Sequence, residues 1–196
     1  MSSSKDGYHH GDLARALEDA AMQLLERMPA AEISLREVAR AANVSHNAPY
    51  HHFSDRLGLL KVLAERSMAD LLTQVRTDAE RASTPRAALA DAGSAYIRFA
   101  VEHPHAFDAV YDPTVCVPGS PTATMAPLID GLETVLAEGV AAAGLDRPTD
   151  AVVVWGLIHG LGTLAAAGHF TLDDALVAYA AALDRLLPSP DPAPAP

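Results

Sequence analysis

The sequence predicts an all-α protein. Hydrophobic residues make up 49% of the 196 residues and aromatic residues only 5%, with alanine dominant. No segment alternates apolar β-branched and polar residues as a half-buried strand would, and the only β-branched cluster, residues 152–154, lies in a longer segment typical of a buried helix. Apolar residues instead recur every three or four positions over most of the chain, which is the spacing of one helical face.

The first two helices are predicted from an amphipathic pattern and a capping signal. Residues 11–28 carry leucine and alanine at helical spacing, and Pro29 follows the end of the pattern. A short second helix is expected over 34–41, where Ser34 is a candidate N-cap. Glu37 stands three residues later, which is the capping-box spacing.

A third short helix is expected over 45–52. Residues 41–43 supply small side chains and a turn former, and Ser45 can cap the helix that follows. Pro49 removes one helical hydrogen bond and can tighten the first turn. A capped helix, a turn of about three residues and a second helix with a polar face form the helix-turn-helix layout, which places its second helix in the DNA major groove.

The polar face of this third helix carries the predicted base contacts. Asparagine can pair with an adenine edge through two hydrogen bonds, and an alanine methyl can touch a thymine methyl. The alternative is a helix-turn-helix that serves only for packing. We expect the base-reading side chains to be exposed, and they are His46, Asn47, Ala48 and His51.

The pattern of the remaining sequence predicts a long helix followed by a helical body. With the three helices already described, about nine helices are expected in the whole chain. A Pro- and Gly-rich loop is expected over 112–121, Thr171 is a candidate cap, and the Pro/Ala tail has no core-forming residues. The expected domains are a DNA-binding head over 1–55, a ligand-binding and dimerisation domain over 56–187 and a disordered tail over 188–196. The further helices are expected at about 56–82, 85–103, 104–111, 122–143, 148–169 and 171–187.

The net charge of −11 is distributed unevenly. Residues 1–66 hold eight Lys and Arg against nine Asp and Glu, whereas the remainder holds six against sixteen. The head is therefore near neutral, and we expect tight DNA binding only at a specific site and at low to moderate salt. One cysteine, Cys116, fits a reducing, cytoplasmic location. No membrane contact is expected, because the most apolar segment, 151–170, contains two histidines and four glycines.

The head resembles the TetR/AcrR family of repressors. In that family the recognition helix ends in Tyr-x-His-Phe-like residues and a basic residue begins the next helix; here Tyr50, His52-Phe53 and Arg56 hold those places. Residues 8–26 resemble the first helix of the family. The resemblance implies phosphate contacts by Tyr50 and Arg56, with secondary candidates at Ser34, Arg36 and Ser45.

The C-terminal half resembles the ligand domains of the same family. Residues 96–107 match a Tyr-x-x-Phe-Ala-x-x-His-Pro stretch, and Trp155 with His159-Gly160 looks like a subgroup with a Trp…His-Gly motif. A cavity with aromatic walls and few charges suits a neutral, partly apolar effector. The alternative for each residue is ordinary core packing. The predicted lining residues are Tyr96, Phe99, His103, Phe107, Tyr111, Met125, Trp155 and His159.

Small residues on one late helix predict a homodimer. Gly156, Gly160 and Gly162 allow close helix approach, and a leucine-rich helix follows them. Two such helices from each of two chains would form a four-helix interface, as in the resembled family, and would place two heads on a palindromic DNA operator. The alternative is packing within one chain.

The sequence therefore predicts a ligand-responsive DNA-binding repressor. The alternatives are an effector-independent regulator or activator, and a helical ligand-binding protein or enzyme with a non-functional head. No nucleophile elbow, glycine-rich phosphate loop or paired-carboxylate motif is present, so no enzymatic activity and no cofactor are expected. His103-Pro104-His105 could suggest a metal, but the proline breaks the helical spacing that would align the imidazoles, so no metal site is expected.

Overall fold

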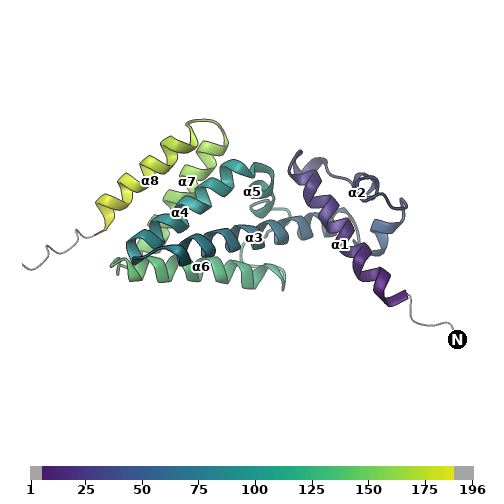
Figure 1. The fold of residues 1–196 in the computed structure, drawn as a ribbon, viewed down its shortest axis with the longest axis horizontal. Helices are drawn as coiled ribbons and strands as arrows, with labels where there is room; N and C mark the ends of the chain where they lie inside the picture. The colour runs from purple at the N-terminus through teal and green to yellow at the C-terminus, as the bar shows by residue number, and fades with distance from the viewer. Residues whose placement is uncertain (1–5, 188–196) are drawn as a thin grey trace, which may run out of the picture. The chain divides into compact units, whose positions relative to one another are not determined.

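The structure is a computed structural model that describes residues 6–187, and side chains from residue 12 onward. The described chain contains eight α-helices and two short 3-10 helices (Figure 1), which confirms the all-α prediction. It divides into an N-terminal unit, residues up to Met68 with His105–Ala126, and a C-terminal unit, Ala69–Pro104 with residues from Pro127 on. The functional boundary expected after residue 55 stays a prediction, and the tail expected to be disordered lies outside the described residues.

The N-terminal unit is built around a small apolar core. Leu17, Ile33, Val38 and Leu63 have no exposed surface, and burial of each such side chain contributes about 1.5–3 kcal/mol. These residues come from the three helices of the head and the segment that joins the first two. The elements of the unit are α1 (Asp6–Leu25), η1 (Ala30–Glu32), α2 (Leu35–Ala41), η2 (Ala48–His51), the first half of α3 (Arg56–Arg81) and most of α5 (Pro104–Val110).

The predicted capping box at the start of α2 is confirmed. The Ser34 hydroxyl accepts a hydrogen bond from the Glu37 backbone N–H at 3.3 Å, and a Glu37 carboxylate oxygen accepts one from the Ser34 N–H at 2.9 Å. The hydrogen bonds from Ser34 lower the pKa of Glu37. The helix ends at Ala41 with Ala42 as its C-cap, and the next residue, Asn43, has φ +54°, a conformation that asparagine tolerates better than most residues. These two local signals set both ends of the first helix of the helix-turn-helix.

The C-terminal unit is a helical bundle in which α4 packs closely against α7 and α8, and α7 against α8. The predicted cap at Thr171 is confirmed, because its hydroxyl accepts a hydrogen bond from the Asp174 N–H at 3.1 Å within a second capping box. Arg98 donates to Asp78 at 3.1 Å and links α4 to α3. The elements are the second half of α3, α4 (Pro85–Glu102), α6 (Met125–Ala142), α7 (Asp150–Ala166) and α8 (Leu172–Leu186).

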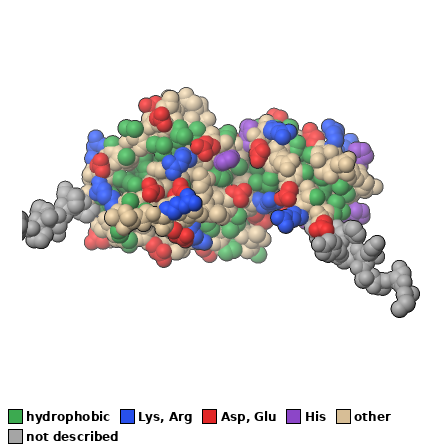
Figure 2. Space-filling model, viewed as in Figure 1, with side chains coloured by type: hydrophobic (Ala, Val, Ile, Leu, Met, Phe, Trp, Pro, Cys, Tyr) green, Lys and Arg blue, Asp and Glu red, His purple; other side chains and the backbone are tan. Residues whose placement is uncertain are grey.

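On the face that Figure 2 displays, acidic and basic side chains lie intermingled on both units. A search of the described helices finds none with the length and apolar character needed to span a bilayer.

Candidate functional site

We call residues Ser45–His52 the reading segment. The α-helix expected over 45–52 is replaced by a turn and the four-residue 3-10 helix η2. Pro49 has no N–H for the bond to the Ser45 carbonyl, and its ring would clash with that carbonyl in an α-helix. The backbone instead bonds over three residues, from Ala48 N–H to Ser45 O at 3.0 Å and from His52 N–H to Pro49 O at 3.0 Å. The N-cap of η2 is Asn47, not the expected Ser45, and its side chain forms no cap hydrogen bond.

The reading segment has one buried side and one exposed side. Ala48 and Pro49 are buried, and η2 packs against α2. The expectation that Ala48 lies on the exposed face is wrong, because the tight 3-10 turn directs its methyl inward and leaves the residue only 7% exposed. The exposed side carries the other candidate base contacts and one candidate phosphate contact, namely His46, Asn47, His51 and Tyr50.

The remaining candidate DNA contacts differ in how freely they are presented. Arg36 and Ser45 are exposed. The Ser34 hydroxyl is engaged in the capping box. Arg56 is exposed at the first position of α3, and its Nη2 donates to the Ala31 carbonyl of η1. Because a guanidinium carries five N–H donors, Arg56 can hold this carbonyl and still present donors to a phosphate.

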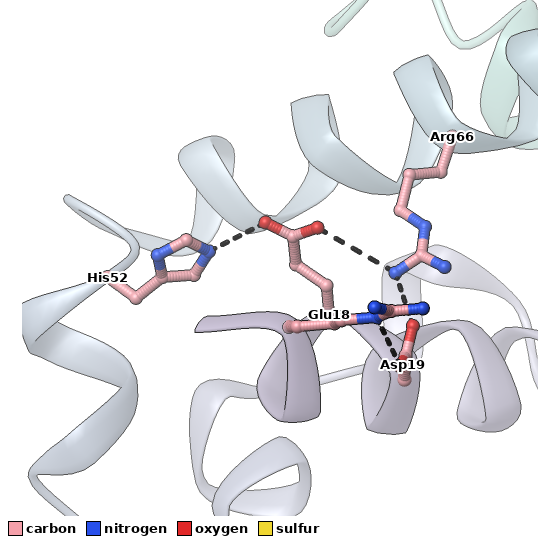
Figure 3. A network of polar contacts seen from close by, with 5 residues as sticks. Glu18, Asp19, His52 and Arg66 are labelled. Carbon is pink, nitrogen blue, oxygen red and sulfur yellow. Dashed lines mark hydrogen bonds and ion pairs between the residues drawn. The ribbon is translucent and has the colours of Figure 1, made fainter. Parts of the chain in front are cut away.

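A network of charged side chains lies beside the reading segment (Figure 3). Glu18 of α1 uses one carboxylate oxygen to contact His52 Nε2 at 2.8 Å, and its other oxygen lies 3.7 Å from Arg66 Nη1. The same Arg66 nitrogen donates to Asp19 at 2.8 Å, and Arg15 lies 3.9 Å from Asp19. Sequence reasoning did not single out Glu18, because its partners are 34 and 48 residues away and no local motif marks them.

The C-terminal unit contains a partly enclosed cavity between α3, α4, α6, α7 and α8. Its empty volume is about 500 Å³, which includes the part that opens to solvent. Polar side-chain atoms in the lining come from Tyr96, Trp155 and Tyr179, and the other lining residues are aliphatic, alanine or glycine. No charged side chain lines the cavity, so it has the composition of a site for an apolar small molecule.

The tyrosine hydroxyls of the cavity wall are already hydrogen-bonded. Tyr96 is 1% exposed, and its hydroxyl lies 2.9 Å from His159 Nδ1. Burial lowers the pKa of His159, which favours the neutral imidazole. Tyr179, also 1% exposed, donates to the Leu89 carbonyl at 2.8 Å, and burial raises its pKa. Its ring lies against the bare Cα of Gly93.

The structure brings together part of the predicted pocket set. Tyr96 and Trp155 line the cavity, and His159 adjoins it through its bond to Tyr96. Phe99 is buried on α4 outside the lining, with its ring 5.1 Å from that of His103, which is exposed. The three other predicted residues, Phe107, Tyr111 and Met125, belong to the N-terminal unit. The lining residues that sequence reasoning missed include Gly93, Leu132, Leu136 and Tyr179.

An apolar face is exposed on α7 and α8. Large hydrophobic side chains there include Val152, 66% exposed, and Val177, 69% exposed. Within the described chain, a Cβ placed on Gly156 or Gly160 would meet no atom within 4 Å outside its own helical surroundings. Gly162 differs, because a Cβ there would lie 3.1 Å from Ala100 of α4. Gly156 and Gly160 are therefore open, whereas Gly162 packs within the chain.

Along residues 12–187, no group of three or more His, Cys, Asp or Glu could hold a metal ion.

Two family profiles match the chain. Residues 17–63 match the family described as bacterial regulatory proteins, tetR family, and residues 89–187 match the tetracyclin repressor-like C-terminal domain. A search of the curated proteins finds no significant match.

Solved structures of similar fold cover almost the whole chain. A protein of unknown function from Rhodococcus sp. RHA1 is 30% identical, with a TM-score of 0.73, over 93% of this chain and 99% of that one. A TetR-family transcriptional regulator from Streptomyces coelicolor is 22% identical, with a TM-score of 0.64, over 87% and 80% of the two chains. The regulator LfrR from Mycobacterium smegmatis, in complex with proflavine, is 19% identical, with a TM-score of 0.66, over 90% and 98%.

The N-terminal profile covers the capped α2, the reading segment and the start of α3, and the C-terminal profile covers most of the helices that surround the cavity. The two profiles together account for the DNA-binding head and for the body that follows it. The chain belongs to the TetR family of DNA-binding transcriptional regulators.

Proposed function

We propose that the protein is a homodimeric repressor that binds a palindromic operator and is released from it by a small, neutral, largely apolar molecule. The observation that carries this proposal is the cavity of the C-terminal unit, with its aromatic residues and its lack of charged side chains. An effector that binds one conformation of the C-terminal unit more tightly than another shifts the equilibrium between the corresponding arrangements of the heads. The size of this shift is limited by the difference between its affinities for the two conformations.

The lining argues for the polarity of the effector. A charged ligand would lose its hydration without meeting an opposite charge, which is costly in an apolar site. The hydroxyls of Tyr96 and Tyr179 already have partners, so they offer few additional hydrogen bonds. Trp155 also lines the cavity and provides an aromatic surface there. The TetR-like fold of LfrR holds proflavine, which illustrates that this architecture can accommodate a small aromatic molecule.

The exposed face of α7 and α8 supports the homodimer. Exposed valines and two open glycines form a surface onto which a second copy could pack its own α7 and α8. Two heads held in one dimer would read two half-sites about one DNA turn apart.

The Trp…His-Gly subgroup is part of the same proposal. The rings of Trp155 and His159 lie 5.7 Å apart, and His159 bonds to Tyr96 of the cavity wall. We infer that this motif serves the ligand site: Trp155 contacts the effector, and His159 holds the Tyr96 hydroxyl away from it.

A neutral fluorescent probe tests the proposed ligand site. N-phenyl-1-naphthylamine should bind and quench Trp155, the only tryptophan, at least about tenfold more tightly than its sulfonated analogue 8-anilino-1-naphthalenesulfonate, because the lining offers no cation. Ala92→Leu, which fills the cavity from α4, should weaken the binding of the neutral probe. The surface variant Ala141→Leu is the matched control and should leave it unchanged. Equal binding of both probes, or no effect of Ala92→Leu, would contradict the proposed ligand site.

Substitutions in the head test the proposed DNA contacts. Tyr50→Phe combined with Arg56→Ala should weaken binding to operator and random DNA alike, because phosphate contacts carry no sequence information. Asn47→Ala should chiefly relax base preference, at about 1–3 kcal/mol for a lost bidentate contact. Fluorescence anisotropy with both kinds of duplex separates the two effects. Unchanged operator affinity in both variants rejects the assignment, and thermal unfolding checks that the loss of the Arg56–Ala31 bond has not unfolded the head.

A further inference from the structure

We propose that Glu18 is a positioning residue for operator recognition, and that it acts through His52 to hold the end of the reading segment in place. Glu18 lies on α1 and does not belong to the proposed DNA contacts. Its carboxylate joins the reading segment to α1 through His52 and approaches α3 through Arg66 (Figure 3). The inference goes beyond the proposed effector and dimer and depends on neither.

The reading segment needs such an anchor because its own backbone holds it weakly. The helix η2 has only four residues, and 3-10 hydrogen bonds are poorer in geometry than α-helical ones. Its buried side consists of Ala48 and Pro49 alone, so only two side chains of η2 pack into the core of the head. Among the side chains from 45 to 52, only His52 forms a hydrogen bond within the described part of the chain.

The contact has the geometry of a fixed anchor. His52 Nε2 lies 2.8 Å from Glu18 Oε1, and the two side chains are 28% and 29% exposed, so the contact is partly shielded from water. His52 is the C-cap of η2, and its ring packs edge-on against Phe53 at 4.5 Å between ring centres. Phe53 is 2% exposed. The imidazole is therefore held on one side by the core and on the other by the carboxylate.

The charges around Glu18 restrain its carboxylate from the opposite side. Arg66 lies 3.7 Å from the second carboxylate oxygen and donates to Asp19 at 2.8 Å, and Arg15 lies 3.9 Å from Asp19. The carboxylates of Glu18 and Asp19 thus balance the guanidiniums of Arg66 and Arg15. Among the described residues, the hydrogen bond between the His52 N–H and Glu18 is the one contact that joins this charged group to the reading segment. Partial exposure of the network keeps each ion pair modest, so the effect on binding is moderate.

The sign of the effect separates positioning from simple electrostatics. Removal of a carboxylate from a DNA-binding head reduces repulsion of phosphates, which tightens binding to every sequence. Loss of an anchor instead lets the reading side chains depart from the geometry that base edges require, which weakens binding only where bases are read. Glu18→Ala should therefore weaken operator binding and leave random-sequence binding equal or tighter.

The experiment measures the affinity of the full-length variants for a duplex operator, selected beforehand with the wild-type protein, and for a random duplex of equal length. Glu18→Ala and His52→Ala should each weaken operator binding about threefold to tenfold, and the double variant should be no weaker than either single one. His52→Gln places an amide N–H near the position of Nε2 and should restore near-wild-type affinity. Asp12→Ala removes an exposed carboxylate from the same helix and is the matched control, with operator affinity equal to wild type or tighter.

Three results would overturn the proposal: operator binding by Glu18→Ala as tight as that of wild type, additive losses in the double variant, or an equal loss on operator and random DNA. Thermal unfolding of each variant shows that the assay temperature lies below its transition. If Glu18→Ala unfolds below that temperature, the comparison of His52→Ala with His52→Gln decides alone, and equal losses in those two variants overturn the proposal.

Discussion

Gly160→Trp is expected to separate the protomers of the proposed homodimer and to weaken operator binding by about a hundredfold or more. Gly160 lies on the exposed face of α7, and a Cβ there meets no atom within 4 Å in the described chain beyond its own helical surroundings. The larger side chain therefore fits a single chain, whereas a closely packed partner helix would be overpacked at a typical cost of about 1–3 kcal/mol. Separated heads lose the effective concentration that links two half-sites, which is worth about a hundredfold to ten-thousandfold.

The control places the same side chain on a different exposed helix surface. Ala141→Trp on α6 should leave both mass and operator affinity unchanged, because α6 does not contribute to the face of α7 and α8. Light scattering at micromolar concentration reports the mass of each variant, and fluorescence anisotropy reports its affinity. A wild-type monomer, or a Gly160→Trp dimer with normal affinity, would reject the proposed α7–α8 interface.

Gly93→Ala is expected to destabilise the C-terminal unit by about 2–4 kcal/mol and to disrupt the cavity. A Cβ on Gly93 would lie 2.2 Å from the Tyr179 hydroxyl oxygen and 2.4 Å from Cζ, distances that real Cβ atoms do not adopt. The Tyr179 ring would have to move, which would break its bond to the Leu89 carbonyl and separate α8 from α4. The better helix propensity of alanine offsets about 1 kcal/mol at most.

The effect of Gly93→Ala on the free energy of unfolding should no longer be destabilising once the tyrosine ring is removed. In a Tyr179→Ala background, the Cβ of Gly93→Ala no longer meets the ring atoms that are its three nearest neighbours, and the gain in helix propensity should leave the double variant equally stable or slightly more stable than Tyr179→Ala. Tyr179→Phe keeps the ring and loses the hydroxyl bond alone, at about 1 kcal/mol. Urea unfolding of the set measures these differences. A cost of Gly93→Ala that is equal in both backgrounds would mean that the ring is not its cause.

The elements were predictable where the signal is local in sequence. Ser34 with Glu37 set the start of α2 and Thr171 set the start of α8, because a cap needs only residues within one turn. The long α3 followed from its apolar spacing. Pro49 indicated a tightened first turn. The structure has a 3-10 helix in place of the whole α-helix, because few residues remain between the proline and Phe53.

The site was less predictable because it depends on contacts between distant residues. Tyr96 and Phe99 share a helical face, but the cavity borders only Tyr96, since periodicity gives the face of a helix and not the extent of its neighbours. Tyr179 reaches the Leu89 carbonyl across 90 positions because Gly93 lacks a side chain, and no local pattern marks that pair. The Glu18–His52 bond was not predicted for the same reason.

The most direct measurement is selection of bound sequences from random duplex DNA by the wild-type protein, followed by sequencing. A homodimeric repressor is expected to enrich one palindrome whose half-sites are centred about one helical turn apart, because two identical heads read it. Addition of N-phenyl-1-naphthylamine at saturating concentration tests whether filling the cavity reduces the enrichment, as release by a neutral effector requires. The absence of any enriched motif, or an enriched motif without two-fold symmetry, would contradict the account of a homodimeric, sequence-reading repressor.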